Sequence, residues 1–394
     1  MLSFIKYKYM NPQIDNYCIN PAVLKWARLT IGYDLITASK KLGISVETLE
    51  KWENGSEEAP VQKIKILADV YKRATTVFLL NVIPEENVSP SFRKLLYDNL
   101  ESFSTDTLLA IRKAIRIQNL ALDAFGLKQN QFLVDLRNLE IKPGEYEKTA
   151  LEIINLLGLS EDLITKPKGE FEQLNLWKNA IEAKGIYILE LGFNVDEAKG
   201  FAIYDSIAPV IVLNTNDTPK VRVFTLLHEL SHFVMQTDAI DDNESIFSYN
   251  KNKVETICNY IAGSIIVPSS FLNNKLLRLQ INPQENIEMT IDILSRVFNV
   301  SKQVLLRRLF ITDNIDKDNF VKYQNVLRDN YLSSKHVKKK QTGGDFYVKY
   351  MKNNSKAFVY DVLDAYRVKR IGYGDVLNFL NLKSSTLTKL EARL

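Results

Sequence analysis

The order of hydrophobic and polar residues predicts a mostly helical chain with one short run of strands. Between residues 21 and 80, apolar residues three or four positions apart predict short amphipathic helices. The same spacing recurs in three further segments, at 104–126, 146–157 and 174–183. Branched and aromatic residues between turn signals predict a small antiparallel sheet from 185–191, 200–204 and 209–214. The expected fold class is therefore α+β, mostly α with a small β-sheet.

Two of the N-terminal helices have the spacing of a helix-turn-helix unit, with the turn at Gly43. Ser45 is suited to cap the second helix and Gly55 to end it. In DNA-binding proteins of this kind the second helix enters the major groove. The residues predicted to face DNA would then be Ser45, Thr48 and Lys51.

The charge of this second helix leaves its ligand open. Residues 45–53 carry Glu47, Glu50 and Glu53 against Lys51 alone, which is unfavourable beside a polyanion. Residues 21–80 hold nine Lys or Arg and seven Asp or Glu, a weak positive balance. Two alternatives remain: a DNA-binding module, or a helical module that binds protein or only packs.

The strongest chemical signal is the run Phe-Thr-Leu-Leu-His-Glu-Leu-Ser-His-Phe at 224–233. Two of the three histidines in the chain, His228 and His232, stand four positions apart in this apolar run, and Glu229 lies between them. On a helix both imidazoles leave the same face and can bind one metal ion, while Glu229 can reach a water molecule at that metal. The pattern is typical of a zinc metallopeptidase.

A catalytic zinc site needs a third protein ligand and an open position for water. Glu255 begins an apolar helical stretch that stops before Pro268, and a charged residue there needs a partner such as a metal. The alternative ligands belong to the polar stretch 237–252, which reads as an exposed loop; they are Asp238, Asp241, Asp242 and Glu244.

Composition and charge exclude few classes of function, and the use of cysteine fits a reducing compartment. Its 394 residues allow two or three domains, and 46% hydrophobic with 25% charged residues is ordinary for a globular protein. The net charge of +4 neither requires nor excludes nucleic acid. Cys18 and Cys258 stand in unrelated contexts, and no secretory signal or membrane-spanning stretch is apparent. We expect a cytoplasmic protein without a membrane partner.

The breaks along the chain predict six segments. They are a helix-turn-helix domain at 1–80, a linker at 81–103, a metallopeptidase domain at 104–285, a helix-turn-helix-like segment at 286–337, a linker at 338–345 and a C-terminal helical domain at 346–394. In the fourth segment Ser301 is suited to cap a helix that carries Arg307 and Arg308, which makes this segment more basic than the first.

Together these motifs resemble the ImmA/IrrE metallopeptidases. The run at 224–232, followed by Glu255, Cys258, Asn259 and Ala262 at their spacing and by Pro268, is similar to that family over roughly residues 21–310. An XRE-type helix-turn-helix module precedes the peptidase in longer members. The resemblance implies a gluzincin-like site with His228, His232 and Glu255 as zinc ligands and Glu229 as the catalytic residue. It also implies a bacterial or phage origin and limited proteolysis of a repressor.

The leading hypothesis is a Zn²⁺-dependent endopeptidase that cleaves a protein, a repressor or antitoxin-like regulator. Glu229 would take a proton from the attacking water and pass it to the leaving amine. Four residues are candidates for stabilising the oxyanion: Arg222, Tyr249, Tyr260 and His336. We expect the strand at 209–214 to pair with an extended substrate. The alternatives are a DNA-binding regulator or antitoxin with an idle or structural zinc site, and a protein-interaction scaffold.

Overall fold

The computed structural model describes residues 18–84, 103–235, 247–334 and 345–394, with the backbone alone for 247–252 and 330–334. The chain divides into two compact units, one up to Leu109 and one from Ala110 on, and each is described by itself. Most of the expected linker at 81–103 and most of that at 338–345 lie outside the described residues. Among the helices that are described, none is both long and apolar enough to cross a membrane.

The first unit contains the expected helix-turn-helix. Its elements are α1 (Pro21–Leu29), α2 (Leu35–Leu42), α3 (Val46–Asn54), η1 (Val61–Lys63), α4 (Ile64–Tyr71) and η2 (Thr75–Leu79). Gly43, between α2 and α3, has a φ of 67°, a left-handed conformation that glycine adopts without strain. The side chain of Ser45 accepts a hydrogen bond from the amide of Thr48, and Gly55 ends α3. The local sequence therefore determines where α3 begins and ends.

Helices make up most of the second unit. It contains the part of α6 (Thr105–Ala124) from Ala110 on, α7 (Gln131–Arg137), α8 (Tyr146–Leu156), α9 (Glu161–Thr165), α10 (Glu170–Glu182), α11 (Pro219–Met235), α12 (Phe247–Ile266), α13 (Ser269–Leu279), α14 (Ile287–Val297), α15 (Lys302–Ile311), α16 (Lys317–Ser334), α17 (Phe346–Asn354), α18 (Lys356–Arg367), α19 (Tyr373–Leu380) and α20 (Ser384–Glu391). Together with a small sheet they confirm the expected α+β class.

The sheet consists of β1 (Tyr187–Leu191), β2 (Gly200–Ile203) and β3 (Val210–Asn214) in the order β1-β3-β2. β3 pairs with β2 antiparallel but with β1 parallel, so the expectation of an antiparallel sheet is wrong for the β1–β3 pair. Side-chain alternation reports which face of a strand is buried and carries no information on strand direction. Because β3 has a neighbour on both sides, the expectation that 209–214 pairs with substrate is also wrong. The edge strand that contacts α11 is β2.

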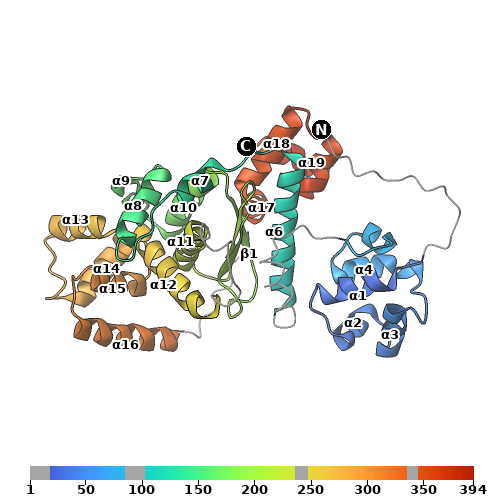
Figure 1. Cartoon of the computed structure of the whole chain (residues 1–394), viewed down its shortest axis with the longest axis horizontal. Coiled ribbons are helices and arrows are strands. Elements are labelled where there is room, and N and C mark those ends of the chain that lie inside the picture. Colours follow the sequence, from blue (N-terminus) through green and yellow to red (C-terminus); the bar gives the residue numbers. More distant parts are fainter. Residues whose placement is uncertain (1–17, 85–102, 236–246, 335–344) are drawn as a thin grey trace. The chain divides into compact units, whose positions relative to one another are not determined.

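Helices cover both faces of the sheet (Figure 1). On one face Ile188, Ile211 and Leu213 join the core that includes α11 and α12. On the other face Tyr187 packs edge-on against Phe358 of α18, with ring centroids 5.8 Å apart. Its hydroxyl donates a hydrogen bond of 2.6 Å to Asp361. The C-terminal helices α17 and α18 thus cover the sheet of the unit that contains α11.

The segment expected at 286–337 shares the core of the same unit. Ile291 of α14 and Leu306 of α15 are buried in the cluster that contains the apolar face of α11. Ser301 caps α15 as expected. Arg308 is 1% exposed and pairs with Glu147, so it contributes no basic surface. The six-segment division stays a prediction, whereas the contacts themselves separate the chain only near residue 109.

Candidate metal centre

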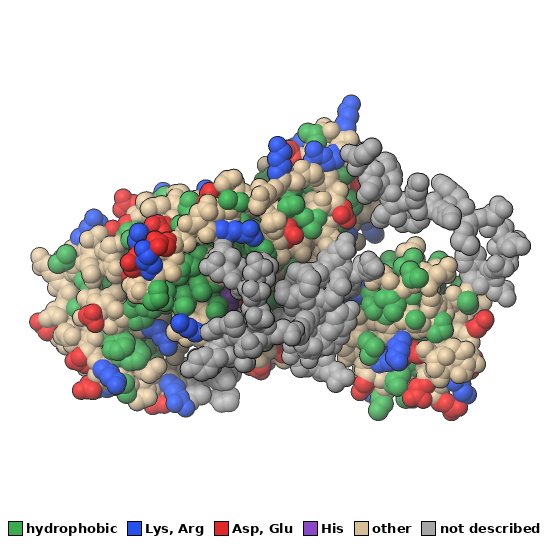
Figure 2. Space-filling model, in the orientation of Figure 1, with side chains coloured by type: hydrophobic (Ala, Val, Ile, Leu, Met, Phe, Trp, Pro, Cys, Tyr) green, Lys and Arg blue, Asp and Glu red, His purple; other side chains and the backbone are tan. Residues whose placement is uncertain are grey.

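Helix α11 places His228 and His232 on one face. The opposite face carries Leu226, Leu230 and Phe233, which are buried in the core with the sheet and α12. This apolar stripe determines the rotation of the helix, and the two histidines, four positions apart, are left half-buried on the other side. Figure 2 shows histidine surface on this view of the molecule, bordered by hydrophobic side chains. The imidazoles are therefore supported by packing and still reach the surface.

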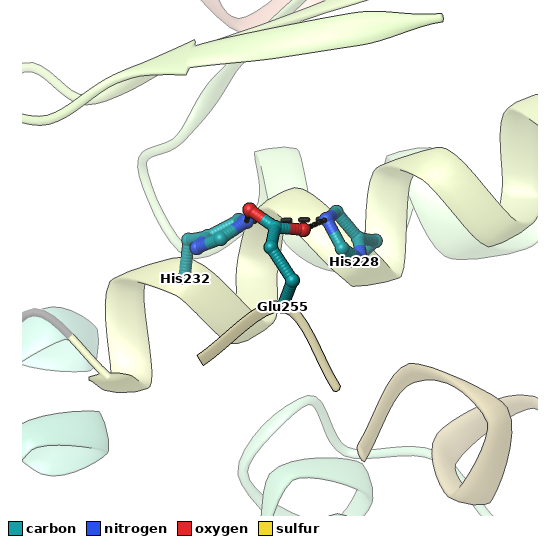
Figure 3. Close-up of side chains that lie close together, drawn as sticks. All are labelled: His228, His232 and Glu255. Atoms are coloured by element: carbon teal, nitrogen blue, oxygen red, sulfur yellow. Dashed lines mark hydrogen bonds and ion pairs between the residues drawn. The ribbon is translucent and has the colours of Figure 1, made fainter. Parts of the chain in front are cut away.

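Helix α12 brings Glu255 against both histidines (Figure 3). Its two carboxylate oxygens lie 3.2 Å from Nε2 of His228 and 3.5 Å from Nε2 of His232, and the two Nε2 atoms are 3.1 Å apart. Among the described residues, this trio is the group whose ligand atoms could hold a metal ion. In a tetrahedral zinc site with bonds of about 2.0–2.2 Å, ligand atoms are about 3.4 Å apart. The observed spacings fit that geometry.

Glu229 lies on α11 next to His228 and is half-buried. Burial and, to a smaller extent, the negative charge of Glu255 together raise the pKa of its carboxyl to about 8. The pKa of His232 is lowered by burial and by His228, against an opposing effect of Glu255. The site is thus a partly desolvated pair of carboxylates with two imidazoles, and a divalent cation is the natural counter-charge for it.

A sulfur atom and an aromatic ring support the imidazoles. Sγ of Cys258 lies 3.5 Å from Nδ1 of His232, the ring nitrogen that does not face Glu255. Phe224, one turn before His228, stacks on its ring with centroids 6.3 Å apart. Nδ1 of His228 is buried without a hydrogen-bond partner among the described residues. The side chain of His232 therefore has a defined contact through its second nitrogen, of the kind that orients histidines in metal sites.

A buried ion network fixes α11 to the sheet. Glu190 of β1 is 1% exposed and pairs with Arg222 of α11 and Lys178 of α10. Burial acts to raise the pKa of Glu190, but Lys178 and Arg222 outweigh it and hold the pKa below its ordinary value. Removing one partner from such a network leaves an uncompensated buried charge. The charged cluster therefore anchors the helix six residues before His228.

The other site candidates are distributed as follows. Arg222 is committed to Glu190 and is not available to an oxyanion. Tyr260 packs against Tyr146, with ring centroids 5.1 Å apart, and near Arg308. The side chain of Tyr249 and all of His336 lie outside the described residues, as do the alternative ligands Asp238, Asp241, Asp242 and Glu244. The contacts of the described candidates, Arg222 and Tyr260, are thus with residues other than the trio of His228, His232 and Glu255.

The three residues predicted to face DNA lie at the start and on the exposed side of α3. Ser45 and Thr48 are joined by a 2.8 Å hydrogen bond between their hydroxyls, and both serve the cap. The amine of Lys51 forms a 2.8 Å ion pair with Glu47. Glu53 points inward to a buried pair with Arg28, so only Glu47 and Glu50 remain acidic at the surface of α3.

Sequence reasoning missed the contact of Cys258 with His232 and the anchoring role of Glu190. A signal for the first was present, since Glu255 and Cys258 stand three positions apart and share a helix face. No local signal identifies Glu190. It is a single carboxylate in a five-residue strand with four buried residues, and the sequence of the strand does not indicate which cations it contacts in the fold. It pairs with two cations from different helices.

Comparison with known families agrees with both parts of the chain. The peptidase M78 family, described as the IrrE N-terminal-like domain, matches residues 181–310. A helix-turn-helix family matches residues 24–78. No curated protein matched the chain. The first range runs from before β1 to the penultimate residue of α15 and contains all three residues of the candidate metal centre. The chain therefore carries an IrrE N-terminal-like domain of a metallopeptidase family behind a helix-turn-helix domain, the ImmA/IrrE architecture that its motifs resemble.

Proposed function

We propose that the chain is a zinc-dependent endopeptidase that makes limited cleavages in a protein partner, a transcriptional repressor or an antitoxin-like regulator. The observation that carries the proposal is the convergence of His228, His232 and Glu255, whose ligand atoms lie 3.1–3.5 Å apart. Glu229 follows the first ligand directly on the same helix. The peptidase family match supports the reaction class, and the resemblance to ImmA/IrrE proteins supports the substrate class.

The donor set favours zinc as the cofactor. Two imidazole nitrogens and one carboxylate form a mixed nitrogen and oxygen set, which suits Zn²⁺ better than Mg²⁺ or Ca²⁺. Three protein ligands leave a fourth position open, as catalytic zinc sites do, whereas structural sites are closed by four. The half-buried ligands and their surface access favour the catalytic alternative.

Each residue of the site has a separate task in hydrolysis. Bound Zn²⁺ supplies a Lewis acid, which makes water more acidic and polarises a carbonyl group. Glu229 accepts the proton of the attacking water and delivers it to the leaving amine, and its partial burial supports a pKa suited to both transfers. β2 is the edge strand beside α11, and its backbone suits an extended peptide that adds to the sheet.

The decisive experiment uses the full chain, zinc analysis and the protein encoded by the adjacent gene, because a regulatory protease tends to be encoded near its target. Cleavage is followed by mass spectrometry of the fragments. Glu229→Gln should lower the cleavage rate about 10²- to 10⁴-fold and leave the bound zinc unchanged. His232→Ala should lose the zinc. Glu50→Gln, on the exposed surface of α3, is the matched control and should cleave normally.

Two outcomes would overturn the proposal. Full cleavage by Glu229→Gln would remove the mechanism. A zinc-loaded chain that leaves its partner intact but binds one DNA sequence selectively would instead favour the regulator with an idle or structural zinc site.

A further inference from the structure

A second concave site lies in the C-terminal part of the chain, on elements other than those of the metal centre. An open cavity of about 390 Å³ is lined by residues of α6 and α17, by the last residue of α19 and by the two residues that follow it. Its lining residues include Lys113 of α6, Lys349 of α17 and Leu382, just after α19. The volume falls in the range of small-ligand pockets, about 300–1,000 Å³.

The charge of this cavity is positive and has no internal counter-charge. Its lining includes Lys113 and Lys349 and no carboxylate. Arg116, one turn after Lys113, donates a hydrogen bond of 2.7 Å to the carbonyl of Asn378. Burial and the neighbouring Arg116 lower the pKa of Lys113 to about 8, and no acidic group opposes them. Among the described residues, neither lysine amine has an ion-pair partner.

Two other polar groups of the cavity wall already have hydrogen-bond partners. The hydroxyl of Tyr350 donates a 2.6 Å hydrogen bond to the carbonyl of Leu380. The amide of Asn354 donates to the carbonyl of Tyr350 at 2.9 Å. The first bond connects α17 to the end of α19, and the second lies within α17. Of the donors that line the cavity, the two ammonium groups and the side-chain amide of Asn381 therefore remain for a ligand.

An aromatic and aliphatic wall stands beside the amines. Phe346 is 55% exposed although it belongs to the cavity lining. It stacks on Tyr350 with ring centroids 6.0 Å apart and an angle of 28°. Leu380 and Leu382 add apolar surface. An exposed flat ring next to unpaired cations suits a ligand that has both an anionic group and an organic part.

We propose that this cavity binds a small phosphate monoester, with its phosphate held by Lys113 and Lys349 and its organic part against Phe346 and Leu382. Charge decides between the candidate anions. A phosphate monoester carries about −1.5 to −2 at pH 7 and matches two ammonium groups, whereas a carboxylate neutralises only one. Lysine binds phosphate as a point charge and needs no bidentate geometry.

The test measures binding to the full chain by calorimetry at fixed ionic strength. Adenosine monophosphate and glucose 6-phosphate distinguish a nucleotide from a sugar phosphate, inorganic phosphate probes the anion alone, and adenosine is the neutral control. We expect adenosine monophosphate to bind and adenosine not to bind. Lys113→Met and Lys349→Met should each weaken binding at least tenfold, because each removes a charged hydrogen bond. Phe346→Ala should weaken the binding of adenosine monophosphate and leave the binding of inorganic phosphate unchanged.

Lys389→Met is the matched control, because Lys389 is an exposed lysine of α20 outside the cavity. It should bind as the wild-type chain does. Lys349 is itself exposed, so its substitution tests the site even where Lys113→Met fails to fold. The proposal is overturned if no phosphate compound binds, if binding is unchanged in both lysine variants, or if adenosine binds equally well. Preferential binding of a single-stranded oligonucleotide without a terminal phosphate would also overturn it.

Discussion

Sγ of Cys258 lies 3.5 Å from Nδ1 of His232, while Nε2 of the same ring faces Glu255. A histidine that binds metal through Nε2 carries its proton on Nδ1, and a partner there fixes both tautomer and ring orientation. Burial raises the pKa of the Cys258 thiol to about 12, so the sulfur is a neutral, weak acceptor. Cys258 is thus a positioning residue for His232.

Replacing Cys258 with Ala should weaken zinc binding about tenfold, the low end for loss of an outer partner of a ligand histidine. Cys258→Ser, which keeps an acceptor, should retain affinity within a few-fold. Competition with a chelator measures both. Cys18→Ala removes the exposed cysteine and serves as the control. Equal zinc affinity in Cys258→Ala and Cys18→Ala would contradict the positioning role.

Gly200 permits the close approach of β2 to α11. A Cβ atom at this position would lie 2.5 Å from Cγ2 of Thr225 and 2.7 Å from the carbonyl oxygen of Val212. The second contact is with backbone and cannot be relieved by a side-chain rotation. Gly200→Ala should therefore lower the free energy of unfolding by about 1–3 kcal/mol. Because Thr225 lies one turn before His228, zinc affinity should fall as well.

Gly374 provides the matched control for this substitution. It lies in α19, and a Cβ atom there meets nothing within 4 Å. Gly374→Ala should be neutral or stabilising, since alanine favours the helix. Urea unfolding and zinc titration of both variants measure the difference. An unfolding midpoint for Gly200→Ala equal to that for Gly374→Ala would show that β2 and α11 are not in close contact.

The parts of the fold that depend on local sequence could be predicted, and those that depend on distant partners could not. Ser45, Gly55 and Ser301 act through groups within a few residues, so the ends of their helices follow from sequence. His228 and His232 meet because helix geometry alone places them together. Glu255 required a choice between one helix and a loop, which only tertiary packing decides.

The direction of β1 and the position of Arg308 are two features that could not be predicted from the local sequence. The parallel pairing of β1 with β3 depends on the path of the chain that connects the two strands. The burial pattern of each strand would be the same in a parallel and in an antiparallel pair. Arg308 reads as a basic surface residue, yet it is buried against Glu147 of α8, 161 positions earlier. The partner of such a charged residue is set by the tertiary fold and cannot be read from the local sequence.

The Glu147–Arg308 pair should make stability depend on pH. Burial acts to raise the pKa of Glu147, but Arg308 and hydrogen bonds from Ser264 and the amide of Ser269 outweigh it and lower the pKa. A lowered carboxyl pKa stabilises the fold above the unfolded value of about 4.3, and this stabilisation is lost as pH falls through the folded value. Glu147→Gln should lower the free energy of unfolding by about 2 kcal/mol at pH 7.

The difference between Glu147→Gln and the wild-type chain should shrink as the pH is lowered below 4, because the wild-type carboxyl is then neutral too. Urea unfolding at several pH values measures it. Glu140→Gln is the control, since Glu140 pairs with Lys142 on the surface and is not part of the buried network. It should leave the unfolding midpoint unchanged at every pH. A stability difference that is constant between pH 7 and pH 3 would refute the linkage to this carboxyl.

Glu47 and Lys51 decide whether α3 can contact a phosphate backbone. Their 2.8 Å ion pair occupies the amine that DNA binding would require, and Glu50 adds a second exposed negative charge.

If α3 contacts DNA, Glu47→Gln should strengthen DNA binding because it frees Lys51, and Lys51→Gln should weaken DNA binding. The dependence of log affinity on log salt should change by about one in opposite directions, since each phosphate contact releases counterions. Fluorescence anisotropy across a salt series measures both slopes, and Lys25→Gln is the control, because Lys25 is an exposed lysine of α1. Unchanged slopes in both α3 variants would instead favour the alternative of a helical module that binds protein or only packs, with which the acidic surface of α3 agrees.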